Sequence, residues 1–445
     1  SQAIFMDESG LDLSSYLHSY PKIATTKHIV LERQLLARSG EILRSILPGQ
    51  HWLLVADQTT WPLAGPTVAA SAQQSGITTR PHIIESTEPT ASNTAVAALH
   101  PHLAGTTALV AIGSGTINDI AKMAAHQAGL PYAVVASAPS MNGYTSSIAA
   151  LLVDGVKTTQ PCTPPVACLG DLEMLAAAPH RMVAAGLGYL LSKPVSNADW
   201  LLAHALANGV HSTTAANLIA ASADFIAGIA GQLPAPTAVG KLMASLCLSG
   251  LAMSVAGTSA PASGGEHLIS HYLDMTHHAF GAPNDLHGCQ VGVATLATAA
   301  LYEKLLALDP QAIDVNDLVA HHPAWSDYEP IVRERFGPLA AAILPHARQG
   351  HPTRNALRTR LTRLRETWDE LLAVLRPTLR SPEVIRAELL AARCPTTFTA
   401  IGIDAERARR AIAHSKDIRP RYTILHLATE LGRLEEWTAD LRHVI

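Results

Sequence analysis

Cysteine, charge and long apolar runs are all scarce in this chain, and each shortage excludes a class of protein. Only five of the 445 residues are cysteine and none lies in a CxxC pair, so we expect no disulfide framework and a reducing, cytoplasmic setting. The formal net charge of -4 offers no basic surface for nucleic acid or for an anionic membrane. Gly, Pro and His interrupt the apolar runs before the roughly 18 residues that a membrane span needs, so no membrane segment is expected.

Aromatic residues make up 4% of the chain, whereas hydrophobic residues make up 48%. This balance predicts a globular protein whose core is packed by Ala, Leu, Val and Ile. Ala-rich helical faces often pack against another subunit, so a homo-oligomer is expected. The length predicts two or more domains. The first residues show no basic stretch followed by an apolar core, and a secretory leader is therefore not expected.

Short apolar runs alternate with helical segments up to about residue 180, and helical spacing alone follows. The clearest runs are continuous β-branched and aliphatic stretches at residues 51–57, 108–113 and 132–136. Such runs are typical of strands that are buried on both faces of a parallel sheet. The sequence thus predicts an α/β dinucleotide-binding domain with a parallel sheet over residues 1–180. An all-α domain follows over 181–445, and the cleft between the two is the expected active site.

A glycine-containing turn follows the second of these runs. Glycine lets a backbone approach a pyrophosphate closely, and the start of the next helix offers N–H groups to the anion. A plain strand-to-helix turn explains the same residues equally well, and the spacing differs from GxGxxG. The turn and the helix start consist of Gly113, Ser114, Gly115, Thr116 and Ile117.

Asp57 closes the first of the predicted strands. A carboxylate at this place commonly accepts hydrogen bonds from the adenosine ribose, which would favour NAD over NADP. The same residue type also caps helices. The sequence leaves both roles open.

Four segments together resemble the glycerol-1-phosphate dehydrogenase branch of the iron-containing alcohol dehydrogenase and dehydroquinate synthase superfamily. They read GSGTINDIAK, SAPSMNGYTSS, ASGGEHLISHYLDM and LHGCQVGVAT, and they occupy residues 113–122, 137–147, 262–275 and 286–295. Their order and spacing extend the resemblance over about residues 20–440.

The resemblance implies hydride exchange between NAD or NADP and a small phosphorylated polyol. It places residues 113–117 under the cofactor pyrophosphate and Ser137, Ser140 and Ser146 against the cofactor. It implies that Asn142 and His271 contact the substrate. It also gives His267 and His287 to a divalent metal, which is zinc, iron or nickel in family members.

The third metal ligand of the family is an aspartate, and this chain has Tyr189 in its place. A phenol with a pKa of about 10 does not replace a carboxylate as an ordinary ligand. Tyr189 and Lys193 are four residues apart, so on one helix the ammonium would lower the pKa of the phenol and make it an acid for a developing alkoxide. The alternative, which the sequence favours equally, is that Tyr189 fills the metal pocket of a homologue that has lost the metal and the activity.

His267 and His271 are also four apart, so they project from one face of the predicted helix. A site without the aspartate ligand could still bind a metal if His271 or Cys289 became a direct ligand. Glu266 either orients the imidazole of His267 or is solvated.

Three functions follow from these residues. The first is an NAD(P)-dependent oxidoreductase that acts on a small phosphorylated or polyhydroxylated alcohol or ketone, with catalytic roles for Tyr189, Lys193 and His271. The second is a lyase or cyclase of the dehydroquinate synthase type, which reduces and reoxidises its cofactor within one turnover. The third is a homologue that kept the fold and lost the chemistry.

Overall fold

The computed structural model describes residues 10–20, 23, 25–154 and 156–445. Part of the segment in which a leader was sought, residues 1–9, lies outside them. Contacts divide the chain into two units. The first comprises Ser1–Leu190 and Thr214–Thr258, and the second comprises Leu191–Thr213 and Ser259–Ile445. This division differs from a boundary at 180/181, because a helical segment beyond residue 213 joins the first unit.

A seven-stranded sheet forms the centre of the first unit, with the order β1-β2-β9-β6-β5-β3-β4. All neighbouring strands are parallel except β1 and β2, and β7 and β8 form a separate antiparallel pair. The strands are β1 (Gly10–Asp12), β2 (His28–Glu32), β3 (His51–Asp57), β4 (Thr78–Ile84), β5 (Ala108–Gly113), β6 (Tyr132–Ala136), β7 (Ile148–Val153), β8 (Val156–Pro161) and β9 (Ala167–Asp171).

The three strands predicted from the sequence are confirmed as β3, β5 and β6, with the predicted bounds. Every residue of β5 and β6 is buried, which explains their uninterrupted apolar sequences. The edge strand β4 was not identified. None of its residues is buried and it contains Pro81, and an edge strand tolerates a residue that cannot donate to a neighbour.

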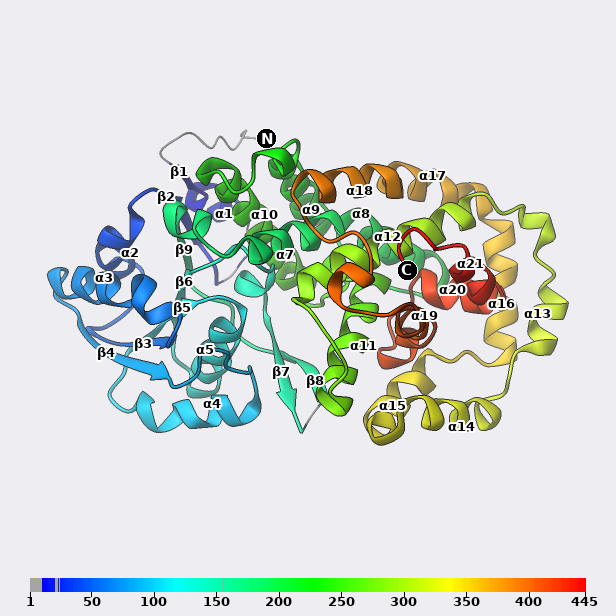
Figure 1. The fold of residues 1–445 in the computed structure, drawn as a ribbon, viewed down its shortest axis with the longest axis horizontal. Coiled ribbons are helices and arrows are strands. Elements are labelled where there is room, and N and C mark those ends of the chain that lie inside the picture. Colours follow the sequence, from blue (N-terminus) through cyan, green and yellow to red (C-terminus); the bar gives the residue numbers. More distant parts are fainter. Residues whose placement is uncertain (1–9, 21–22, 24, 155) are drawn as a thin grey trace. The chain divides into compact units, whose positions relative to one another are not determined.

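Helices cover the sheet of the first unit. Side chains of β3, β5, β6 and β9 form one hydrophobic core with α2 and α3. Helices α4 and α5 pack against each other. Figure 1 shows these four helices around the sheet. The helices of this unit are α1 (Ser14–His18), α2 (Ser39–Arg44), α3 (Thr60–Gln74), α4 (Asn93–Leu99), α5 (Gly115–Ala128), α6 (Leu172–Ala176), most of α7 (His180–Leu191) and of α9 (Thr213–Ile226), and α10 (Pro236–Ala256).

The chain reverses its direction across the sheet between β3 and β5. From β3 it continues through α3 to β4 at the edge, whereas from β5 it continues through α5 to β6 on the other side. Ligands of open parallel sheets bind at the carboxyl ends of the strands where the order reverses in this way. Asp57 ends β3 and Gly113 ends β5, so both predicted cofactor positions lie at this switch point.

The loop that follows β6 is fixed to α10. Thr145 donates its hydroxyl to the carbonyl of Cys247 at 2.6 Å, and Ser254 donates to the carbonyl of Thr145 at 3.0 Å. A Cβ atom on Gly250 would lie 2.3 Å from the carbonyl oxygen of Asn142, so the close approach requires glycine. These contacts explain why α10 belongs to the sheet unit.

α10 is also the exception to the expectation about apolar runs. By length and composition it is apolar enough to cross a membrane, but 83% of its most apolar window is buried inside the protein. A buried core helix meets the same criterion.

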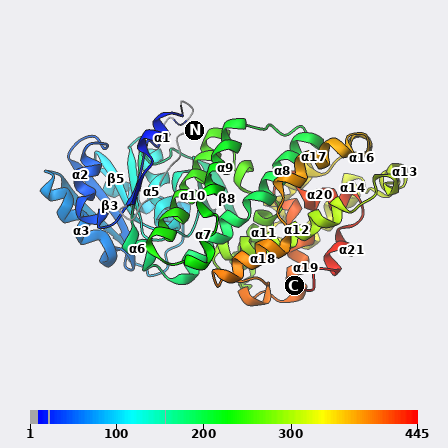
Figure 2. The same cartoon turned by 90° about the horizontal axis from the view of Figure 1, so that it is seen from above.

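Among the described residues of the second unit, all regular secondary structure is helical. It contains α8 (Lys193–Leu206), α11 (Gly265–Phe280), α12 (His287–Leu306), α13 (Val315–His321), α14 (Trp325–Phe336), α15 (Ala340–Gly350), α16 (Arg354–Glu366), α17 (Trp368–Thr378), α18 (Pro382–Ala391), α19 (Ala405–His414), α20 (Ile424–Glu430) and α21 (Leu434–Ala439). α11 packs against α12, and α17 against α8 (Figure 2).

Asp199 on α8 connects several of these helices. Its Oδ1 accepts hydrogen bonds from the Tyr302 hydroxyl at 2.6 Å and the Ile424 amide at 2.7 Å. Its Oδ2 accepts from the amide of Gly265, the first residue of α11, at 2.7 Å. The carboxylate therefore joins α8 to α11, α12 and α20.

We predict that Lys122→Met destabilises the first unit. The Lys122 side chain is fully buried, and its ammonium donates to the carbonyls of Gly143, Ser146 and Ile148 at 2.6 to 3.0 Å. Removal of this cation leaves buried acceptors without their donor, which should lower the free energy of unfolding by about 3 kcal/mol in urea denaturation. Arg33→Ala breaks a half-exposed ion pair with Glu173 and should cost less than about 1 kcal/mol. Equal costs would contradict this role of Lys122.

Asp199→Asn should destabilise the helical unit, because an amide nitrogen replaces one acceptor and then faces a donor. We expect a loss of about 2 kcal/mol or more in unfolding free energy, measured from the thermal midpoint by circular dichroism. Asp317→Asn is the matched control, since Asp317 is exposed and pairs only with an exposed histidine. A midpoint for Asp199→Asn that equals that of Asp317→Asn rejects the connecting role.

Candidate active site

The turn between β5 and α5 has the local structure that a pyrophosphate needs. Gly113 ends β5, Ser114 is the N-cap residue without a side-chain cap, and Gly115 begins α5. A Cβ atom on Gly113 would lie 2.7 Å from the Cβ atom of Ile117, so glycine is required for the tight turn. Thr116 and Ile117 lie in the first turn of a 14-residue helix, whose N-terminus attracts anions.

Asp57 has a capping role in the structure. Its Oδ1 accepts hydrogen bonds from the amides of Thr59 and Thr60, at 2.9 and 2.7 Å, where α3 begins. Of the two roles that the sequence left open, the cap is therefore the one that is observed. A ribose hydroxyl would have to use Oδ2.

The loop after β6 brings some of its predicted site residues to the turn and buries others. The amide of Ser137 donates to the carbonyl of Gly113 at 3.0 Å, which places the two segments side by side. Ser140 is partly exposed in the same loop. Ser146 is fully buried, and its hydroxyl contacts the carbonyls of Gly143 and Ile148. Its observed contacts are thus those of a scaffold residue.

Asn142 is held by the helix that packs against this loop. Its side-chain amide donates to the hydroxyl of Ser249 on α10 at 3.1 Å, and only 6% of the residue is exposed. The orientation of this predicted substrate residue is therefore set by α10.

The expectation that Tyr189 and Lys193 lie on one continuous helix is wrong. α7 ends at Leu191, and α8 begins at Lys193 with Pro194 in its first turn. Proline lacks the N–H that would continue the hydrogen-bond ladder of α7, so the helix is interrupted at Ser192. Tyr189 is 8% exposed on α7.

Lys193 is buried within the helical unit. Its ammonium donates to the carbonyl of Ala262 at 2.8 Å. Burial lowers the pKa of Lys193 to about 7, because the charged form is poorly solvated. A lysine in this state exchanges a proton near neutral pH.

Three potential metal ligands converge between α11 and α12. His271 and Asp274 come from α11 and His287 is the first residue of α12. One ligand atom from each lies within 4.8 Å of the other two. Two imidazoles and one carboxylate are a donor set that suits divalent transition metals.

His267 lies on the same face of α11 as predicted, but it has a different partner. Its Nδ1 is 2.8 Å from the Glu266 carboxylate. Its ring centroid lies 5.6 Å from that of His287 and 6.4 Å from that of His271. Burial lowers the pKa of His267 well below its usual range, so the ring is neutral. Glu266 is fully buried, which settles its two possible roles in favour of orienting the imidazole.

Asp274 is the site residue that the sequence analysis missed. It follows His271 by three residues, which places both on one face of a helix. That spacing was available in the sequence. Its significance depends on His287, which the fold brings to the same place from 13 residues further along the chain.

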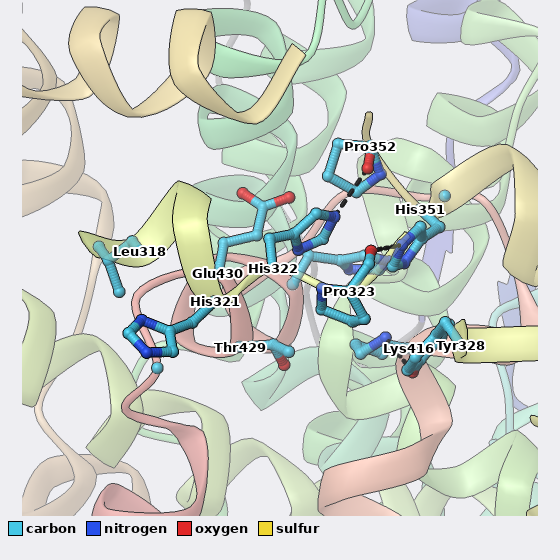
Figure 3. Close-up of a pocket in the computed structure, with 13 residues that line it drawn as sticks. Leu318, His321, His322, Pro323, Tyr328, His351, Pro352, Lys416, Thr429 and Glu430 are labelled. Carbon is cyan, nitrogen blue, oxygen red and sulfur yellow. Dashed lines mark hydrogen bonds between the residues drawn. The ribbon is translucent and has the colours of Figure 1, made fainter. Parts of the chain in front are cut away.

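A separate pocket of about 170 Å³ lies in the helical unit (Figure 3). The rings of His322, His351 and Tyr328 stack along it, with centroids 4.5 and 4.7 Å apart. Its polar groups bond to each other or to the backbone: the two imidazoles contact the carbonyls of Pro352 and Pro323, and Lys416 donates to Tyr328. The pocket shares no lining residue with the group of His271, Asp274 and His287.

Comparison with known proteins agrees with this geometry. Residues 30–179 match the family described as iron-containing alcohol dehydrogenase. The glycerol-1-phosphate dehydrogenase (NAD(P)+) of Bacillus subtilis is 32% identical over 389 residues, which are 86% of this chain and 86% of that protein. The enzyme of the same name from Bacillus licheniformis is 39% identical over 259 residues, and that match covers 57% of this chain and 64% of the relative.

Solved structures show the same fold at low sequence identity. A glycerol dehydrogenase from Schizosaccharomyces pombe has a TM-score of 0.62 and 15% identity, with coverage of 99% of this chain and 93% of the other. A probable glycerol dehydrogenase from Sinorhizobium meliloti 1021 has a TM-score of 0.60 and 15% identity, with coverage of 93% and 97%. The extended match to the Bacillus subtilis enzyme establishes that the chain belongs to the glycerol-1-phosphate dehydrogenase family of the iron-containing alcohol dehydrogenases.

Proposed function

We propose that this protein transfers a hydride between NAD or NADP and a small phosphorylated polyol, with glycerol 1-phosphate as the leading substrate. The observation that carries the proposal is the similarity to the glycerol-1-phosphate dehydrogenase of Bacillus subtilis, which matches 86% of the chain. The position of the Gly113 turn at the switch point of the sheet supports it independently. The alanine-rich helices support assembly as a homo-oligomer, and five free cysteines support a reducing, cytoplasmic setting.

The cofactor is proposed to lie along the carboxyl ends of β3, β5 and β6. The first turn of α5 binds the pyrophosphate through Gly113, Ser114, Gly115, Thr116 and Ile117. Ser137 and Ser140 lie against the remainder of the dinucleotide, and Asp57 meets the ribose through Oδ2. Ser146 contributes by fixing the loop, together with the ammonium of Lys122.

Reduction of a ketone creates an alkoxide, whose charge has to be stabilised or quenched by a proton. When bound, the nicotinamide carries the hydride and a divalent cation polarises the oxygen of the substrate. Asn142 is proposed to contact the substrate, and Tyr189 to hold the proton that the oxygen receives. The group formed by His271, Asp274 and His287 supports a ligand role for His271.

We predict that the purified protein binds NADH or NADPH with a shift in nicotinamide fluorescence. Ser114→Glu should weaken binding at least tenfold, because it places a negative charge where the pyrophosphate meets the helix N-terminus. Gln73→Glu adds the same charge at an exposed position of α3 and should leave affinity unchanged. If neither dinucleotide binds, the proposed function is wrong.

Turnover should appear as net NADH or NADPH formation from glycerol 1-phosphate, with glycerol 3-phosphate as the enantiomeric control. Tyr189→Phe removes only the hydroxyl and is expected to lower kcat at least hundredfold while the affinity for NADH is kept. Unchanged kcat in Tyr189→Phe would exclude the phenol as the acid. Product formation without any net change in dinucleotide would instead identify a lyase.

A further inference from the structure

The starting point is a shortage of negative charge among the family's metal ligands. Two neutral imidazoles and a phenol hold a divalent cation weakly, because the phenol of Tyr189 keeps its proton at neutral pH. A carboxylate from elsewhere would restore the donor set. Within the helical unit, one potential ligand atom of Asp274 lies within 4.8 Å of a ring nitrogen of His271 and of His287.

Distances show that the three side chains fit one cation. Their ligand atoms are within 4.8 Å of each other, so some point lies no more than about 2.8 Å from all three. Zinc bonds to nitrogen and oxygen are about 2.0 to 2.2 Å long. The rings of His271 and His287 are stacked at 4.9 Å and 25°, and imidazole binds a metal in its ring plane, so one ring has to rotate for both nitrogens to meet the cation.

The contacts of Asp274 leave one carboxylate oxygen directed at His287. Gln290 donates its amide to Oδ1 of Asp274 at 2.9 Å. Oδ2 is 3.3 Å from Nδ1 of His287, which matches the roughly 3.4 Å between two ligand atoms on one tetrahedral cation. Gln290 thus fixes the carboxylate in the orientation that a ligand needs.

One neighbour of His287, the hydroxyl of Ser270, is able to give way. The hydroxyl of Ser270 contacts Nδ1 of His287, but the carbonyl of His287 is a second acceptor at 3.4 Å. Gln290 also donates to the Ser270 hydroxyl at 2.9 Å. Ser270 therefore keeps hydrogen-bond partners when a cation takes the imidazole nitrogen.

We propose that His271, Asp274 and His287 hold a divalent transition metal, with the carboxylate ligand supplied by α11 instead of by position 189. Two imidazoles and one carboxylate leave coordination positions for substrate. His267, oriented by Glu266, lies outside this set. The site deepens the proposed dehydrogenase function, in which the cation polarises the substrate oxygen.

The proposed site therefore uses a different set of ligands from the one that the resemblance implies. The resemblance gives position 189 to the metal and His271 to the substrate. Here Asp274 and His271 bind the metal, and neither position 189 nor His267 is a ligand. The exchange keeps the total of one carboxylate and two imidazoles around the cation.

Cation binding is tested with the full-length protein in the absence of any dinucleotide. Co²⁺ is titrated into metal-stripped protein, with calorimetry for affinity and visible absorption for coordination. The wild type should bind one equivalent with an intense four- or five-coordinate spectrum. Asp274→Asn and His271→Ala should each weaken binding by more than a hundredfold, because each loses a direct ligand. His271→Gln replaces His271→Ala if that variant fails to fold by circular dichroism.

His267→Ala separates the two possible ligand sets, because it removes a residue outside the proposed site. It should bind Co²⁺ within threefold of the wild type, as should His278→Ala, an exposed histidine on the same helix. Loss of binding in His267→Ala together with retention in His271→Ala would overturn the proposal, and so would a wild type that binds no Co²⁺. A tenfold to hundredfold loss in Asp274→Asn with an unchanged spectrum would also overturn it, since that pattern marks a residue that only orients His287.

NADH affinity of Asp274→Asn distinguishes this inference from the proposed function. Unchanged NADH binding with lost Co²⁺ binding supports both. A wild type that binds Co²⁺ through these three residues but binds no dinucleotide rejects the proposed function and leaves the metal site standing.

Discussion

The helical unit depends on the carboxylate of Asp199, which accepts three hydrogen bonds inside the protein. One of them fixes the first residue of α11, the helix that carries His267, His271 and Asp274. These three residues follow the i, i+4, i+7 spacing of a single helix face. The hydrogen bond from Gly265 to Asp199 therefore helps to fix the start of the helix that carries these candidate ligands.

Residues with local signals were predictable from the sequence. The strands β3, β5 and β6 and the glycine turn at Gly113 have patterns that need no partner to be recognised. Contacts between distant segments were not predictable in this way. The attachment of α10 to the loop after β6 rests on backbone carbonyls, and the role of Asp274 appears only when α12 brings His287 beside it. Pro194 did offer a local signal, and its position explains why Tyr189 and Lys193 do not share a helix.

Each unit has a buried ionisable side chain that connects several segments through hydrogen bonds. In the sheet unit a buried ammonium, Lys122, organises three carbonyls of the loop after β6. In the helical unit a buried carboxylate, Asp199, organises amides and a hydroxyl. Both side chains are removed from solvent, so the hydrogen bonds to the groups that each connects contribute to its stability.

The central claim is that the carboxylate of Asp274 replaces the family's aspartate ligand. A crystal structure of the zinc-loaded protein, with anomalous data on both sides of the zinc edge, tests it most directly. The account predicts one peak at bonding distance from Asp274, His271 and His287. A peak bound by His267 and His287 with Asp274 in the outer shell would contradict it.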